Sequence, residues 1–136
     1  MLALAGACLL PAPARASDAS DLFDKGTAAF QAGNFDEALT HYRAAWKLNN
    51  AYDIAYSLAL TEVNLGKLRD ACEHFAYALA HFPVTGDADL RKTTEEALAD
   101  AKKSVVTVRV KSTTKDIAVT LDGAPLAPDA LGTELF

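Results

Sequence analysis

The sequence predicts a mainly α-helical fold of two similar antiparallel helical hairpins and a capping helix, followed by a short β segment. Three observations support this prediction. The stretch that follows Gly33 returns in similar form after Gly66, 33 positions later. Apolar residues recur every three or four positions between about residues 20 and 101, as on one face of a helix. Beyond residue 104 they recur at every second position, which is typical of a strand.

Length and composition exclude several classes of protein. The chain has 136 residues, of which 51% are hydrophobic, and a formal net charge of −5. A chain of this length can form one domain with a buried core. Nucleic acid is not expected as a partner, because binding to phosphates depends on a surplus of Lys and Arg. A membrane span is not expected, because the first apolar run reaches only about half of the 20 residues that a spanning helix needs.

Residues 1–16 have the features of a secretory signal peptide. They are apolar from Met1 to Leu10 and end in Ala14-Arg15-Ala16, an A-x-A cleavage pattern. The positively charged start of such a segment is missing, so we expect the true N-terminus to lie upstream of Met1. The predicted location is therefore outside the cytoplasm, in the periplasm or cell envelope.

The two cysteines have different expected fates. Cys8 lies in the apolar run, within LAGAC, where lipid modification is an alternative to simple cleavage. Removal of residues 1–16 would leave Cys72 as the single cysteine, so no disulfide could form within the mature chain. Cys72 lies on the inner face of its predicted helix, where a free cysteine behaves as a small apolar residue.

The first repeat is predicted to contain two helices. A stripe that includes Leu22 and Phe30 predicts a helix over about residues 20–32, which Gly33 and Asn34 end. A second stripe predicts a helix over residues 35–48. Both are short, and the break between them favours an antiparallel pair.

The second repeat follows the same plan. Helices are expected over residues 52–65 and 68–82, and Pro83 ends the second of them because proline cannot continue a helix. We expect small residues to let neighbouring helices approach closely, with larger ones filling the space beside them. The small residues are Gly26, Ala38, Ala45, Ala59, Ala71 and Ala78, and the large ones are Phe35, Tyr42, Trp46 and Phe75.

The spacing of these residues carries a family resemblance. The first copy has Gly33, Phe35, Ala38, Tyr42 and Ala45, and the second has Gly66, Leu68, Ala71, Phe75, Ala78 and Pro83. This spacing resembles the G-x-Y-x-x-A-x-x-x-[YF]-x-x-A-x(4)-P core of tetratricopeptide repeats, with a period one residue shorter than the usual 34. The resemblance covers about residues 19–83. The first copy departs from the pattern, because Asn49-Asn50 stands where proline is usual.

The resemblance implies a non-catalytic scaffold that binds a peptide or protein. In this family the first helix of each repeat lines a concave groove. The matching candidate groove residues are Phe23, Thr27, Phe30, Gln31, Tyr56, Leu60, Val63 and Asn64. Their mixture of aromatic, aliphatic and amide side chains suits an extended or helical peptide ligand. The Lys and Asn pattern with which some members hold a terminal carboxylate is absent.

The remainder of the chain is expected to close the helical stack and begin a β module. A helix that includes Leu90 and Leu98, with Asp87 as its N-cap, should cap the repeats, so the helical domain spans residues 17–103. Residues 104–136 are expected to form a partial β-hairpin or β-sandwich fragment. The stretch IAVTLDGAPL resembles the opening of a PEGA-type β-sandwich module, so we expect the sequence to be part of a longer protein.

No catalytic, cofactor or metal site is predicted. His74 and His81 lie two helical turns apart, but His41 and His74 occupy equivalent positions in the two repeats, which favours structural or surface roles. Two alternatives to a peptide-binding scaffold stay open. One is an envelope or cell-wall structural protein that binds through the β module, and the other is an enzyme whose catalytic part lies outside the sequence.

Overall fold

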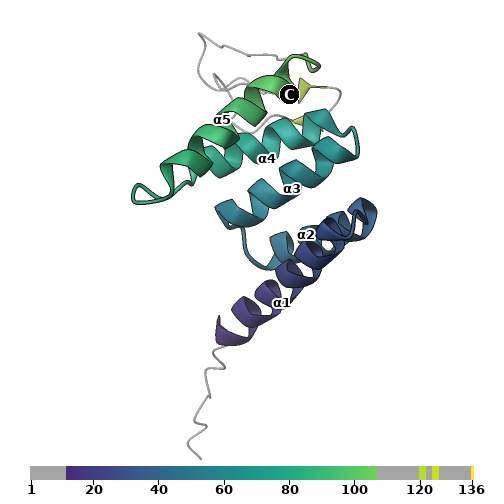
Figure 1. The fold of residues 1–136 in the computed structure, drawn as a ribbon, viewed down its shortest axis with the longest axis vertical. Helices are drawn as coiled ribbons and strands as arrows, with labels where there is room; N and C mark the ends of the chain where they lie inside the picture. The colour runs from purple at the N-terminus through teal and green to yellow at the C-terminus, as the bar shows by residue number, and fades with distance from the viewer. Residues whose placement is uncertain (1–11, 107–119, 122–123, 126–135) are drawn as a thin grey trace, which may run out of the picture.

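The computed structural model describes residues 12–106, 120–121, 124–125 and 136. Helices form most of this part of the chain, which confirms the mainly α-helical prediction (Figure 1). The helices are α1 (Ala12–Gln31), α2 (Phe35–Leu48), α3 (Tyr52–Asn64), α4 (Leu68–Ala80) and α5 (Ala88–Lys102).

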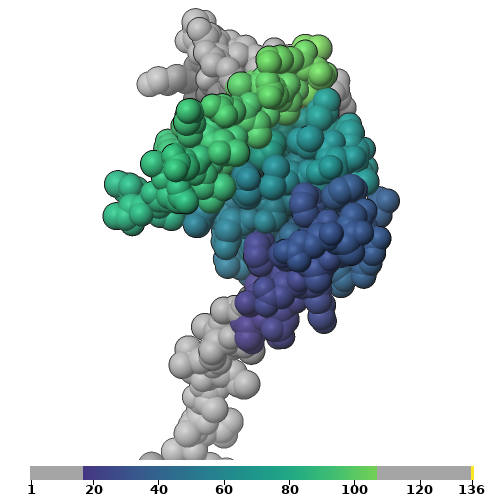
Figure 2. Space-filling view, viewed as in Figure 1, coloured from purple at the N-terminus to yellow at the C-terminus, as the bar shows by residue number. Residues whose placement is uncertain are grey.

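The helices pack as two hairpins and one further helix. Helix α1 packs along α2, α3 packs along α4, and α5 packs against α4 on the side of the molecule far from α1. Helix α2 also contacts α3, so the first hairpin stacks on the second. In the space-filling view the two hairpins lie against each other without a gap (Figure 2). The start of α5 projects on the left of this view.

The helix boundaries differ from the expected ones by more than one residue at two places. Helix α1 begins at Ala12 rather than near Ser20, so it starts inside the predicted signal peptide. Alanine favours helix, and Pro13 is tolerated there because the first turn has no intrahelical partner for its missing N–H. Helix α4 ends at Ala80 rather than at Phe82, two residues earlier than expected.

Both hairpins turn in the same way. Gly33 has a φ of 78° and Gly66 a φ of 70°, and each follows the first helix of its hairpin. In each turn the N–H of the residue after the glycine donates to the carbonyl five positions earlier, at 2.9 and 2.8 Å. This is the Schellman arrangement, which satisfies carbonyls at the helix end and needs a left-handed residue that glycine adopts without steric cost. The sequence repeat is therefore also a repeat of backbone geometry.

The first hairpin is held by close contact at a glycine. Gly26 of α1 is buried against the ring of Tyr42 on α2, and a Cβ at residue 26 would lie 2.7 Å from that ring. Tyr42 is itself only 3% exposed. In the second hairpin Ala59 and Phe75 occupy the equivalent positions, and both are fully buried. The predicted pairing of small and large residues is thus present in both hairpins.

Alanines make up much of the core. They let the helix axes approach closely, because only a methyl group stands between one backbone and the next. The fully or almost fully buried ones are Ala38, Ala45, Ala55, Ala59, Ala71 and Ala78.

Helix α5 closes the stack with one buried side and one polar side. Asp87 caps it as expected, since its Oδ1 accepts from the N–H groups of Asp89 at 2.9 Å and Leu90 at 3.2 Å. Thr94 and Ala101 are buried against the rest of the molecule. Exposed ion pairs, Arg91 with Glu95 and Lys92 with Glu96, lie along α5 and suit the solvated face of a terminal helix.

Few residues of the predicted β module lie within the part of the chain that the structure describes. Strand β1 (Thr120–Leu121) pairs antiparallel with β2 (Ala124–Pro125). The hairpin expected between the strand around Val108 and the strand around Val119 lies outside the described residues, so the module stays a prediction. Within the described helices, none combines the length and the apolar character needed to cross a membrane.

The contact between Gly26 and Tyr42 makes a testable prediction. An alanine in a helix normally stabilises a protein by about 0.5–1 kcal/mol relative to glycine. Here the added methyl group meets a buried ring, so we expect Gly26→Ala to lower the free energy of unfolding by about 1–3 kcal/mol in urea denaturation. In a Tyr42→Leu background the same change should be neutral or stabilising. A gain in stability in the parent chain would contradict this packing.

Candidate functional site

A hollow of about 240 Å³ lies between α1 and α3, and one residue of α2 also lines it. Its lining is mainly apolar, with a few hydroxyl groups. The lining residues are Phe23, Thr27, Phe30, Tyr42, Ser57 and Leu60. We call it the first hollow.

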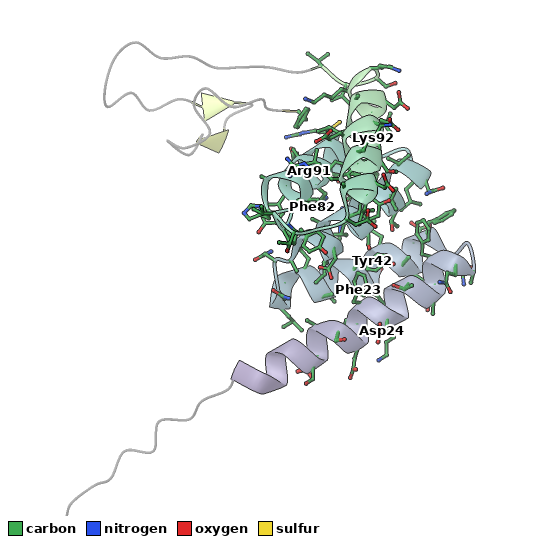
Figure 3. The ribbon with its side chains drawn as sticks, turned by 60° about the vertical axis from the view of Figure 1, so that its left-hand side comes forward. Phe23, Asp24, Tyr42, Phe82, Arg91 and Lys92 are labelled. Carbon is green, nitrogen blue, oxygen red and sulfur yellow. The ribbon has the colours of Figure 1, made fainter. Side chains whose placement is uncertain are left out.

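The lining of the first hollow includes a hydrogen bond between two hydroxyl groups, next to a pair of aromatic rings. The hydroxyl oxygens of Thr27 and Tyr42 lie 3.1 Å apart, and Thr27 also donates to the carbonyl of Phe23 at 3.0 Å. The rings of Phe23 and Tyr42 are 5.4 Å apart and tilted by 51°. Figure 3 shows these two rings next to each other on the side of α1 that faces the rest of the molecule. The hollow is thus built by side chains that hold one another in place.

A second hollow, of about 320 Å³, lies among α3, α4 and α5. Leu60 and Val63 line it from α3, and Ala97 and Asp100 line it from α5. The fully buried ring of Phe75 lies at its inner side. Val63 is 39% exposed, so this hollow presents apolar surface to solvent.

The two hollows are neighbours, because Leu60 lines both. A third hollow, of about 140 Å³ and more polar, shares Phe23 with the first and is bordered by Ser20, Asn49 and Asp53. We call these three hollows together the groove. It runs along the first helices of both hairpins and reaches α5.

Five of the eight candidate groove residues line the first two hollows. They are Phe23, Thr27, Phe30, Leu60 and Val63. The other three lie elsewhere. Gln31 is exposed at the end of α1, Tyr56 packs against Phe75 with ring centroids 6.2 Å apart, and the Asn64 amide donates to the carbonyl of Leu60 at 2.8 Å.

Sequence reasoning missed the parts of the groove that come from other helix positions. Tyr42 forms the floor of the first hollow although it belongs to the second helix of its hairpin. Ser57 lies three positions before Leu60, so the helical period places both on one side of α3. Asp100 lines the second hollow from α5, the capping helix, and the repeat pattern does not extend to this helix.

A buried carboxylate ties three helices together at a different place. Glu62 on α3 has no exposed surface, and its Oε2 lies 2.7 Å from Nδ1 of His74 on α4. Its Oε1 accepts from the guanidinium of Arg43 on α2 at 3.4 Å, and Arg43 also reaches Asp70 at 3.3 Å. A buried carboxylate is costly unless its oxygens have partners. The His74 contact therefore joins the two helices of the second hairpin, and the two Arg43 contacts join the first hairpin to the second.

The sequence carries a signal for this network. Glu62 follows Leu58 by four positions and Ala59 by three, so it falls in the apolar stripe of its helix, where a charged residue requires a partner. His74 also packs edge-on against Trp46 of α2, with ring centroids 5.6 Å apart. None of Glu62, His74 and Arg43 lines the groove. Their geometry thus joins helices and is separate from the hollows.

The remaining candidate residues lie as follows. His41 is half-buried and faces the exposed Glu37 at 3.8 Å, whereas His81 is exposed and stacks on Tyr77 with ring centroids 3.8 Å apart. Cys72 is fully buried, and burial raises the pKa of its thiol above the ordinary value. In the part of the chain that the structure describes, no three His, Cys, Asp or Glu side chains converge on a point where a metal ion could sit.

No protein-family model matches the chain, and a search of curated proteins found no match.

The first prediction from this site concerns His74. His74→Leu leaves one oxygen of the buried Glu62 without its partner, so we expect the free energy of unfolding to fall by about 1–3 kcal/mol. The matched control is His41→Leu at the equivalent position of the first repeat, where the partner is exposed and the loss should be below about 1 kcal/mol.

A double variant completes that experiment. His74→Leu combined with Glu62→Leu removes both polar partners and should recover stability relative to His74→Leu alone. Equal losses for the His74 and His41 variants in urea denaturation would show that the buried Glu62–His74 pair does not stabilise the packing of α3 on α4.

The second prediction concerns Cys72 and pH. Because the folded thiol has a raised pKa, the unfolded chain releases this proton at a lower pH than the folded chain. The contribution to stability is complete below the unfolded pKa and is lost as the pH rises past about 9. The stability advantage of the parent chain over Cys72→Ala should therefore shrink between pH 8 and pH 10.5. A constant difference across that range would contradict the raised pKa.

Proposed function

We propose that the protein is an exported, non-catalytic scaffold of the tetratricopeptide-repeat type, which binds a peptide or protein partner in the groove. The proposal assigns no chemical step to the chain. It places the protein in the periplasm or cell envelope, as the signal-like residues 1–16 suggest.

The observation that carries the proposal is the pair of apolar hollows joined at Leu60. Together they offer open, mainly apolar spaces of about 240 and 320 Å³ along one side of the helical stack. These volumes lie near the lower end of the range for binding pockets, and they leave room for an apolar side chain in each hollow. A short segment that places one apolar side chain in each hollow would bind by the anchor-in-groove mode that helical scaffolds use for peptides.

Two further features support the proposal. The turns at Gly33 and Gly66 have the same geometry, as expected of repeated units. The rings and hydroxyl groups of Phe23, Thr27 and Tyr42 hold one another, so the first hollow exists before a partner arrives. A preformed site lowers the entropic cost of binding.

Two matched substitutions test this function. Val63 and Leu48 are both 39% exposed, but only Val63 lines the groove. Peptides that bind the full chain are first selected from a random peptide array. Val63→Lys places a charged group in the second hollow, so it should weaken their binding at least tenfold, a cost of about 1.4 kcal/mol. Leu48→Lys should leave binding unchanged.

Fluorescence anisotropy measures both affinities, and circular dichroism checks that each variant keeps its helices. If Val63→Lys and Leu48→Lys bind the selected peptides as tightly as the parent chain does, the groove is not the binding site.

A further inference from the structure

The charged residues that line the groove are acidic. Two of the residues that line the three hollows are charged, and both are acidic: Asp53 at the polar end and Asp100 at the α5 end. The lining between them is apolar or carries neutral polar groups. The groove thus has an apolar centre between two carboxylates.

Both carboxylates lie at the surface and are available to a ligand. Asp53 is exposed, and its Oδ1 accepts from the neighbouring N–H of Ile54 at 2.9 Å. Asp100 forms a 2.6 Å pair with Lys103, and both side chains of that pair are 75% exposed. A surface pair of this kind contributes little stability, so an incoming cation can replace Lys103 at low cost.

We propose that the partner of the groove is a basic amphipathic peptide segment, with apolar side chains at its centre and Lys or Arg at both ends. The inference rests on the proposed function and adds the chemistry of the ligand. The apolar side chains would occupy the first and second hollows on either side of Leu60. The terminal cations would pair with Asp53 and Asp100.

The charge of the whole chain favours the same partner. The formal net charge is −5, so a basic segment is attracted at long range while an acidic segment is repelled. Cations at the rim of an interface mainly raise the association rate and the salt dependence of binding. Both quantities can be measured.

The experiment uses the full chain and three synthetic peptides. They share the apolar centre of the tightest peptide from the array and differ only in their flanking residues, which are Lys, Gln or Glu. The Lys-flanked peptide should bind most tightly and the Glu-flanked peptide least tightly, with at least a tenfold difference in dissociation constant at 50 mM salt. That difference should shrink at 300 mM salt, because the charges are exposed.

Isosteric variants of the chain locate the effect. Asp53→Asn and Asp100→Asn should each weaken binding of the Lys-flanked peptide by about two- to fivefold, as expected for exposed charge pairs, and leave the Gln-flanked peptide unaffected. Glu73→Gln is the matched control. Glu73 is an exposed acid on α4 that lines none of the three hollows, so its loss should change neither affinity.

The outcomes separate the two proposals. If the three peptides bind equally and Val63→Lys still abolishes binding, the basic-ligand inference is overturned while the groove remains the binding site. If Glu73→Gln weakens binding as much as Asp53→Asn and Asp100→Asn do, the effect is one of net charge and the inference is again overturned. If no array peptide binds, or if Val63→Lys leaves the affinity for the selected peptides unchanged, both proposals fail.

Discussion

The contact of the Tyr42 ring with the backbone of Gly26 links the packing of the first hairpin to the shape of the first hollow. The ring can lie against α1 only because residue 26 has no side chain. In that position the Tyr42 ring packs against the ring of Phe23, and its hydroxyl group forms a hydrogen bond with that of Thr27. Helix packing and the floor of the first hollow therefore come from one contact. A change made to strengthen the packing of this hairpin would also change the hollow.

A second, polar interaction fixes how the two hairpins stack. Apolar contacts between hairpins are tolerant of small shifts, because burial has no strong directional preference. The carboxylate of Glu62 adds direction, since its two oxygens meet His74 on one helix and Arg43 on another. The hollow between α1 and α3 depends on this stacking, because its two walls belong to different hairpins. The buried network thus positions the groove without forming part of it.

Features with a local cause could be predicted from the sequence. Gly33 and Gly66 mark both turns because the left-handed conformation there favours glycine, and Asp87 marks a helix start because its side chain meets nearby N–H groups. The helix over residues 35–48 begins and ends as expected. Helix α1 begins before the expected residue 20, because the apolar stripe that indicates the helix starts only at Leu22, whereas the alanines before it favour helix without belonging to a stripe.

Features that depend on packing between helices could not be predicted in the same way. Phe23 and Leu60 were expected in the groove from their repeat positions, and they do line it. Tyr56 was expected there for the same reason. Like Phe23, it packs against the aromatic ring on the second helix of its hairpin, but unlike Phe23 it lines none of the hollows. Asp100 could not be placed, because its position depends on how α5 closes the stack rather than on a repeat.

Trp46 gives the molecule a natural optical reporter. It is the single tryptophan of the chain, and it packs edge-on against both His74 and Tyr77, at ring-centroid separations of 5.6 and 4.8 Å. Its indole belongs to the first hairpin, whereas both neighbouring rings belong to the second. Intrinsic fluorescence would therefore record separation of the hairpins without any attached dye, while far-ultraviolet ellipticity records loss of helix. Emission that changes before ellipticity would reveal an intermediate in which the hairpins have come apart but each is still folded.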